Sequence, residues 1–207
     1  MLYEVATTTD AVGFVDVYNK VHASPIWFAV AVAIILPFLI IAVGFIIGNL
    51  GEALALVASL FVDPWLVYAI INYLFFPGVM LHELSHALLA VLTGAKVTEV
   101  ALFKKEGKSL GHVNFKNRGN KLLVTLQYIF ISSAPMFCGA IITYACWYGV
   151  FHIGTLWLRI LLGYIGTAMF FHMTMSPQDI KVYVKGIPLF MCIVFVITLI
   201  LRVSGVV

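Results

Sequence analysis

Long hydrophobic stretches cover most of the chain, and the few charged residues mark where each stretch begins and ends. A hydrocarbon core about 30 Å thick needs about 20 apolar residues in a helix. The pattern predicts five membrane-spanning helices, at about 26–50, 65–93, 122–149, 155–174 and 187–203. Pro77 interrupts the second stretch, so we expect a tilted or kinked span there.

Two segments depart from this pattern. Residues 53–62 are apolar but too short to cross a membrane, and we interpret them as a re-entrant or interfacial element, a candidate sixth helix. Residues 96–117 alternate apolar and polar positions in two runs around a Gly- and Lys-rich turn, which predicts a β-hairpin. The expected fold class is an all-α polytopic membrane protein of five to six transmembrane helices with a small membrane-associated β-hairpin. No repeat or linker interrupts residues 1–207, which predicts a single domain.

The composition excludes other classes of protein. Hydrophobic residues make up 63% of the 207 residues and charged residues 10%, whereas soluble chains carry about 25% charge. A water-facing fold could not cover this much apolar surface, and a disordered chain would be far more polar. An outer-membrane barrel would alternate apolar and polar residues along its strands. The expected partner is therefore the lipid bilayer, and we expect no nucleic-acid partner.

The basic residues predict an orientation in the membrane. Seven of the twelve Lys and Arg residues lie in 95–121, the segment that contains the predicted hairpin, namely Lys96, Lys104, Lys105, Lys108, Lys116, Arg118 and Lys121. Lys181 and Lys185 lie in 176–186, interpreted as a loop on the same side, although Ser176-Pro177 also has the character of a helix start. The excess of positive charge places both segments in the cytoplasm. Five crossings place the N-terminus inside, and a sixth at 53–62 would place it outside.

One motif, His82-Glu83-Leu84-Ser85-His86, points to specific chemistry. Two histidines four residues apart lie on one face of a helix, so both can bind the same zinc ion, and Glu83 can act as general base on the attacking water. The composition gives roughly 0.004 such matches by chance in this chain. A carboxylate deep in a span is costly and marks a functional site. We predict His82 and His86 as metal ligands and Glu83 as the catalytic residue.

Two histidines leave a catalytic zinc short of a third protein ligand. Asp179 is the first candidate, because it begins a predicted helix on the cytoplasmic side; the alternative is that it only stabilises the positive end of that helix. His172, inside the preceding span, is the second candidate, and its alternative is a hydrogen-bonded buried histidine. Asn114 and Ser132 are candidates for positioning a peptide or its oxyanion.

Several of these segments together resemble the site-2 protease family of intramembrane zinc metalloproteases, especially its small members with little beyond the membrane core. The segments are HELSH on a membrane span, TGAKVTEVALF after it, a Gly-rich hairpin ending in GHVNF, and SPQDI after paired apolar spans. The resemblance covers about residues 65–186, and HELSH is its specific part. The family usually has Asn-Pro…Asp-Gly where this chain has Ser-Pro-Gln-Asp-Ile.

The resemblance implies an intramembrane zinc endopeptidase that cleaves membrane-spanning substrates near the cytoplasmic side. It implies one catalytic Zn²⁺ on His82, His86 and Asp179, with Glu83 activating a zinc-bound water. It also implies that the hairpin presents the substrate as an added strand. A regulatory membrane partner and a homo-oligomer are left open.

Two other functions stay open at this point. The zinc site could be a structural clamp or partner-binding module without catalysis, which a protein ligand in the fourth metal position would favour. The same zinc chemistry could also act on a lipid or a small amide. A lateral opening beside the hairpin edge would favour a peptide substrate.

Overall fold

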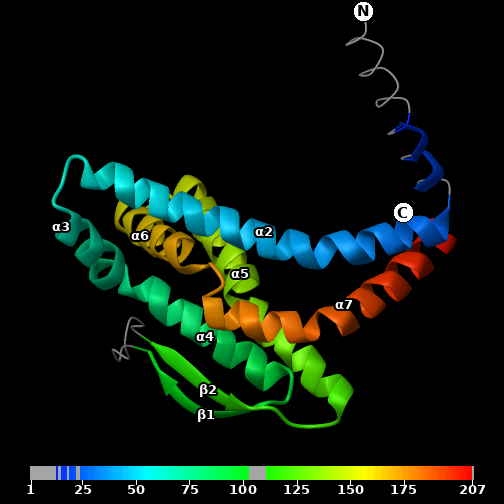
Figure 1. Cartoon of the computed structure of the whole chain (residues 1–207). Coiled ribbons are helices and arrows are strands. Elements are labelled where there is room, and N and C mark those ends of the chain that lie inside the picture. Colours follow the sequence, from blue (N-terminus) through cyan, green and yellow to red (C-terminus); the bar gives the residue numbers. More distant parts are fainter. Residues whose placement is uncertain (1–12, 14, 18, 22–23, 103–110, 207) are drawn as a thin grey trace, which may run out of the picture. The chain divides into compact units, whose positions relative to one another are not determined.

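The computed structural model describes residues 13, 15–17, 19–21, 24–102 and 111–206, which are mostly helical with one small antiparallel hairpin (Figure 1). Contacts divide the chain into two compact units, one of Ile41–Gly186 and one of Met1–Ile40 with Ile187–Val207. All the candidate site residues belong to the unit of Ile41–Gly186. The single-domain organisation stays a prediction. The turn of the predicted hairpin, with Lys104, Lys105 and Lys108, lies outside the described residues.

Helices account for most of the described chain. They are α2 (Pro25–Ser59), α3 (Pro64–Ala69), the π-helical turn η1 (Ile70–Leu74), α4 (Phe76–Leu92), α5 (Lys121–His152), α6 (Leu156–His172) and α7 (Pro177–Val203). Within the described residues, α2, α5 and α7 are long and apolar enough to cross a membrane, and α3 to α4 would add a fourth crossing if the bent pair is one span. Helix α6 is apolar but shorter. The fold class is confirmed to this level, and the count of five to six crossings stays a prediction.

Two predicted boundaries are wrong. Residues 53–62 are not a separate element, because α2 continues without a break to Ser59. A glycine and a charged residue, Gly51 and Glu52, both lie within that helix, and neither ends it. Residues 176–186 are not a loop, since α7 begins at Pro177 and runs to Val203 with Pro188 inside it. Lys181 and Lys185 therefore lie on the first turns of a helix, and the helix start at Ser176-Pro177 is confirmed.

The predicted kink near Pro77 is a break of 47° between α3–η1 and α4. In an unbroken helix the Gly78 N–H would reach the Leu74 carbonyl, but here it donates to the Phe75 carbonyl at 2.9 Å. The Leu74 carbonyl instead accepts a hydrogen bond of 2.5 Å from the Tyr164 hydroxyl on α6. A carbonyl without a hydrogen-bond partner would be unfavourable in a membrane, so the Tyr164 side chain stabilises the break.

The predicted hairpin is confirmed over β1 (Lys96–Ala101) and β2 (His112–Lys116), which pair antiparallel with one irregularity after Val97. Gly94, at φ 78°, follows the end of α4 and turns the chain toward β1.

Fully buried Gln127 on α5 connects the base of the hairpin to the end of α4 through hydrogen bonds. Its amide donates to the carbonyls of Thr93 (3.0 Å) and Arg118 (2.9 Å), and its oxygen accepts from the Arg118 N–H (3.2 Å). These bonds hold the strands beside the helix that carries HELSH.

Helix α4 packs closely against α6 at Gly78, and we expect a larger residue there to destabilise the fold. A Cβ at Gly78 would overlap the backbone carbonyl of Ala168 and approach His172 Nδ1 to 2.6 Å. Because backbone cannot move aside cheaply, Gly78→Ala is expected to destabilise the fold by about 1–3 kcal/mol. Gly163→Ala on α6 is the matched control, since its Cβ would meet only a Val150 methyl at 3.7 Å. Thermal unfolding in detergent should show a lower midpoint for Gly78→Ala alone, and equal midpoints would contradict the close approach.

Candidate metal centre

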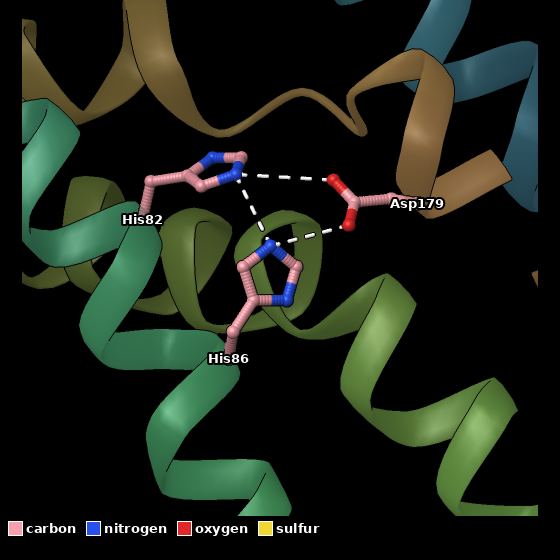
Figure 2. A group of neighbouring side chains, drawn as sticks. All are labelled: His82, His86 and Asp179. Carbon is pink, nitrogen blue, oxygen red and sulfur yellow. Dashed lines mark hydrogen bonds and ion pairs between the residues drawn. The ribbon is translucent and has the colours of Figure 1, made fainter. Parts of the chain in front are cut away.

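The two histidines of HELSH and Asp179 come together at one point (Figure 2). His82 and His86 lie one turn apart on α4, and Asp179 lies in the first turn of α7. His82 Nε2 is 3.2 Å from His86 Nε2, which is 3.3 Å from Asp179 Oδ1. His82 Nε2 is 3.9 Å from Asp179 Oδ2. Ligand atoms from all three residues lie within 4.8 Å of one another, so the group could hold a metal ion.

Backbone carbonyls orient both imidazole rings. His82 Nδ1 lies 2.6 Å from the carbonyl oxygen of His172, and His86 Nδ1 lies 2.7 Å from that of Ile131. A carbonyl oxygen only accepts hydrogen bonds, so each Nδ1 carries the proton and donates it. In the neutral ring the Nε2 lone pair then faces the centre of the group. Metal-binding histidines are held in this way in proteins, with the second ring nitrogen bonded to an acceptor.

The donor set fits a small divalent cation. Two Nε2 lone pairs and a carboxylate converge, and acceptors this close repel one another unless a cation or a proton lies between them. Ligand atoms about 2.0–2.1 Å from a tetrahedral zinc ion are roughly 3.3 Å apart. The closest pairs, His82–His86 at 3.2 Å and His86–Asp179 at 3.3 Å, match that spacing. Two imidazoles and one carboxylate are also a ligand set that catalytic zinc uses.

The other candidate ligand, His172, takes a different position. Its ring Nδ1 lies 2.8 Å from the carbonyl of Ala168 on its own helix, and its ring is not part of the converging group. Its backbone carbonyl accepts a hydrogen bond from His82 Nδ1 and so helps to orient that ring. Within the described residues, no fourth His, Cys, Asp or Glu side chain joins His82, His86 and Asp179.

A cavity of about 790 Å³ opens beside this group. Its lining comprises His82, Glu83, His86, Gly111, His112, Val113, Asn114, Phe115, Ile131, Ser132, Ser176, Pro177, Gln178, Asp179 and Val182. The Glu83 residue is 8% exposed, and it lines the same cavity as His82, His86 and Asp179. The size lies in the range of ligand-binding pockets. Glu83 and the three candidate metal ligands therefore border one cavity.

The strand β2 and the glycine before it form one wall of this cavity, since every residue from Gly111 to Phe115 lines it. A Cβ at Gly111 would lie 2.9 Å from Glu83 Cγ and 3.0 Å from the Ala101 carbonyl. Glycine thus lets the start of the strand lie directly against the Glu83 side chain. The hairpin and the HELSH helix are in this way parts of the same site.

The two polar positions expected to handle a peptide both line the cavity. The Ser132 hydroxyl donates to backbone carbonyls of its own helix, those of Tyr128 and Ile129. The Asn114 amide donates to Glu99 Oε2 at 3.1 Å across the hairpin, and His112 Nε2 lies 3.5 Å from Glu99 Oε1. Asn114 remains exposed on the strand, so of the two it is better placed to meet a bound peptide.

No protein-family profile, curated protein sequence or solved structure matched the chain.

Proposed function

We propose that the protein is an intramembrane zinc metallopeptidase that hydrolyses peptide bonds of membrane-spanning substrates near the cytoplasmic side. One observation carries the proposal: two imidazole nitrogens and a carboxylate converge at the wall of a cavity that also contains Glu83 and the strand β2. The HELSH spacing supports zinc as the metal and Glu83 as the base. The resemblance to site-2 proteases described above points to the same reaction.

The chain's own residues have distinct roles in this reaction. His82, His86 and Asp179 would hold zinc, which when bound supplies Lewis acidity and lowers the pKa of water. Glu83 accepts a proton from the attacking water and later donates it to the leaving amine. The low exposure of Glu83 keeps bulk water from competing for that proton. The carbonyls of His172 and Ile131 keep both imidazoles in the tautomer that binds metal.

We infer that the substrate is a peptide rather than a lipid or a small amide. A membrane helix must unwind before water can reach its peptide bonds, and an extended segment can then pair with a strand edge. Five consecutive residues from Gly111 to Phe115 border the cavity beside Glu83. The strand thus offers backbone groups along the length over which a peptide would lie, which neither a lipid nor a small amide requires.

The arrangement also supports a site inside the bilayer. Exposed aromatic side chains, typical of membrane interfaces, gather at the end of α5 and the start of α6: Tyr144, Trp147, Tyr148, Phe151 and Trp157. The other end of α5 begins at Lys121, beside the basic hairpin. Ile131, which contacts His86, lies about 15 Å along α5 from Lys121 and about 20 Å from Tyr144 at 1.5 Å per residue. The centre would then lie within the membrane, nearer the basic and hence cytoplasmic side.

The proposal is tested by purifying the protein and reconstituting it in liposomes with a single-span membrane protein. We expect cleavage that stops when a zinc chelator is added and returns when zinc is restored. The cleavage position should lie in the cytoplasmic half of the substrate's span. A protein that binds zinc but cleaves no membrane peptide would support the scaffold function instead, and zinc-dependent release of a lipid or small-amide product would support the third function.

We further predict that zinc binding does not depend on the His172 side chain. Because the His172 ring is bonded to its own helix and lies outside the converging ligand atoms, His172→Ala should retain one zinc per chain. His86→Ala, which removes a ligand, is the matched comparison and should lose zinc. Metal content measured by mass spectrometry separates the two. Loss of zinc in a folded His172→Ala variant would mean that the imidazole itself binds the metal.

A further inference from the structure

The carboxylate of Asp179 is held by the residue that precedes α7. The Ser176 backbone N–H donates to Asp179 Oδ2 at 2.8 Å, and the Asp179 N–H donates to Ser176 Oγ at 3.2 Å. Ser176 directly precedes the first helical residue, Pro177, and Asp179 is the third residue of α7. The pair forms a reciprocal capping box, in which each side chain accepts a backbone N–H of the other residue.

These two bonds determine where the carboxylate points. A bond to Oδ2 restricts rotation of the carboxylate, so Oδ1 stays 3.3 Å from His86 Nε2. The bond to Ser176 Oγ holds the first turn of α7, on which Asp179 is carried. Asp179 therefore has two partners of different kinds, a metal-binding group on one side and a helix cap on the other. Ordinary capping would need no histidine nearby, and both Ser176 and Asp179 line the cavity.

We propose that Ser176 is a positioning residue of the metal centre: its hydroxyl and N–H preorganise Asp179 as the third ligand. This inference rests on the proposed function, in which Asp179 binds zinc. Without the hydroxyl, the first turn of α7 would sample more conformations and Asp179 would have to be ordered when zinc binds. Such supporting partners of a metal ligand typically change metal affinity by about 10–100-fold.

The test measures the zinc affinity of the full-length protein in detergent by competition with a chromophoric chelator. Ser176→Ala and Ser176→Gly both remove the hydroxyl, and we expect each to weaken zinc binding by about 10-fold or more. Glycine is tolerated well at helix N-caps, so the second variant keeps the helix start even if the first does not fold. Ser176→Thr retains the hydroxyl and should bind zinc with the wild-type affinity. If the other two variants weakened binding only through lost packing, this recovery with threonine would not be expected.

Asn120→Ala is the matched control, because Asn120 caps α5 by accepting from the Leu123 N–H at 2.9 Å but contacts no ligand in the described site. It should leave zinc affinity unchanged. Equal weakening by Asn120→Ala and Ser176→Ala would overturn the inference, since general loss of a cap would then explain both. Unchanged affinity in Ser176→Ala and Ser176→Gly would overturn it too, while leaving the proposed function intact. A wild-type protein that binds no zinc would instead refute the proposed function.

Discussion

Glu83→Gln is expected to lower the rate of peptide hydrolysis by at least about 10²–10⁴-fold while the protein still binds one zinc per chain. Glutamine has nearly the shape of glutamate, but its amide cannot accept a proton from water at neutral pH. Glu83 lies in the cavity but outside the converging group of ligand atoms, so zinc should stay. The measurement is the initial rate of substrate cleavage in liposomes, with zinc content determined on the same sample.

Glu52→Gln on α2 is the control for this experiment, because Glu52 is exposed and does not line the cavity. It should cleave at the wild-type rate. If Glu83→Gln also cleaves at the wild-type rate, the assignment of Glu83 as general base is wrong. If Glu83→Gln loses its zinc as well, Glu83 contributes to metal binding and its role must be reassigned.

Asp179→Ala is expected to abolish both zinc binding and hydrolysis. Removing a metal ligand has a larger effect than removing its supporting partner, so the zinc affinity should fall by more than about 100-fold. The two remaining imidazoles would be left with their Nε2 atoms 3.2 Å apart and only water to complete a metal's coordination. Equilibrium zinc titration in detergent measures the loss.

Asp63→Ala is the matched control for Asp179→Ala. Asp63 also stands at a helix start, where its carboxylate accepts from the Trp65 N–H at 2.8 Å, but it lies outside the metal-binding group. It should bind zinc as the wild type does. A folded Asp179→Ala variant with unchanged zinc affinity would show that Asp179 only caps α7, the alternative that its sequence position also allows.

The sequence predicts those site residues that are close together in the chain or belong to a rare residue type. His82 and His86 meet because four residues make one helical turn. Asp179 could be proposed from far along the chain because carboxylates are scarce, with nine Asp and Glu residues in all. The structure brings these three together. It leaves the His172 ring, the second candidate, bonded to its own helix.

The carbonyls of Ile131 and His172 could not be predicted, because every residue has a backbone carbonyl and only the packing of α5 and α6 against α4 selects these two. The helix boundaries that failed have a related cause. Apolar pattern alone did not show that α2 continues past Gly51, or that the basic residues Lys181 and Lys185 belong to α7. Glycine and lysine are both tolerated inside a helix when tertiary packing stabilises the neighbouring turns.

The coordination shell of the metal is the most direct test of a catalytic zinc centre at this site. X-ray absorption at the zinc edge on purified protein, followed by a crystal structure with anomalous data, would identify every ligand atom. We expect two imidazole nitrogens from His82 and His86, one carboxylate oxygen from Asp179, and a water in the remaining position, as catalytic zinc sites require. A shell closed by a fourth protein ligand, or zinc bound without Asp179, would contradict the account.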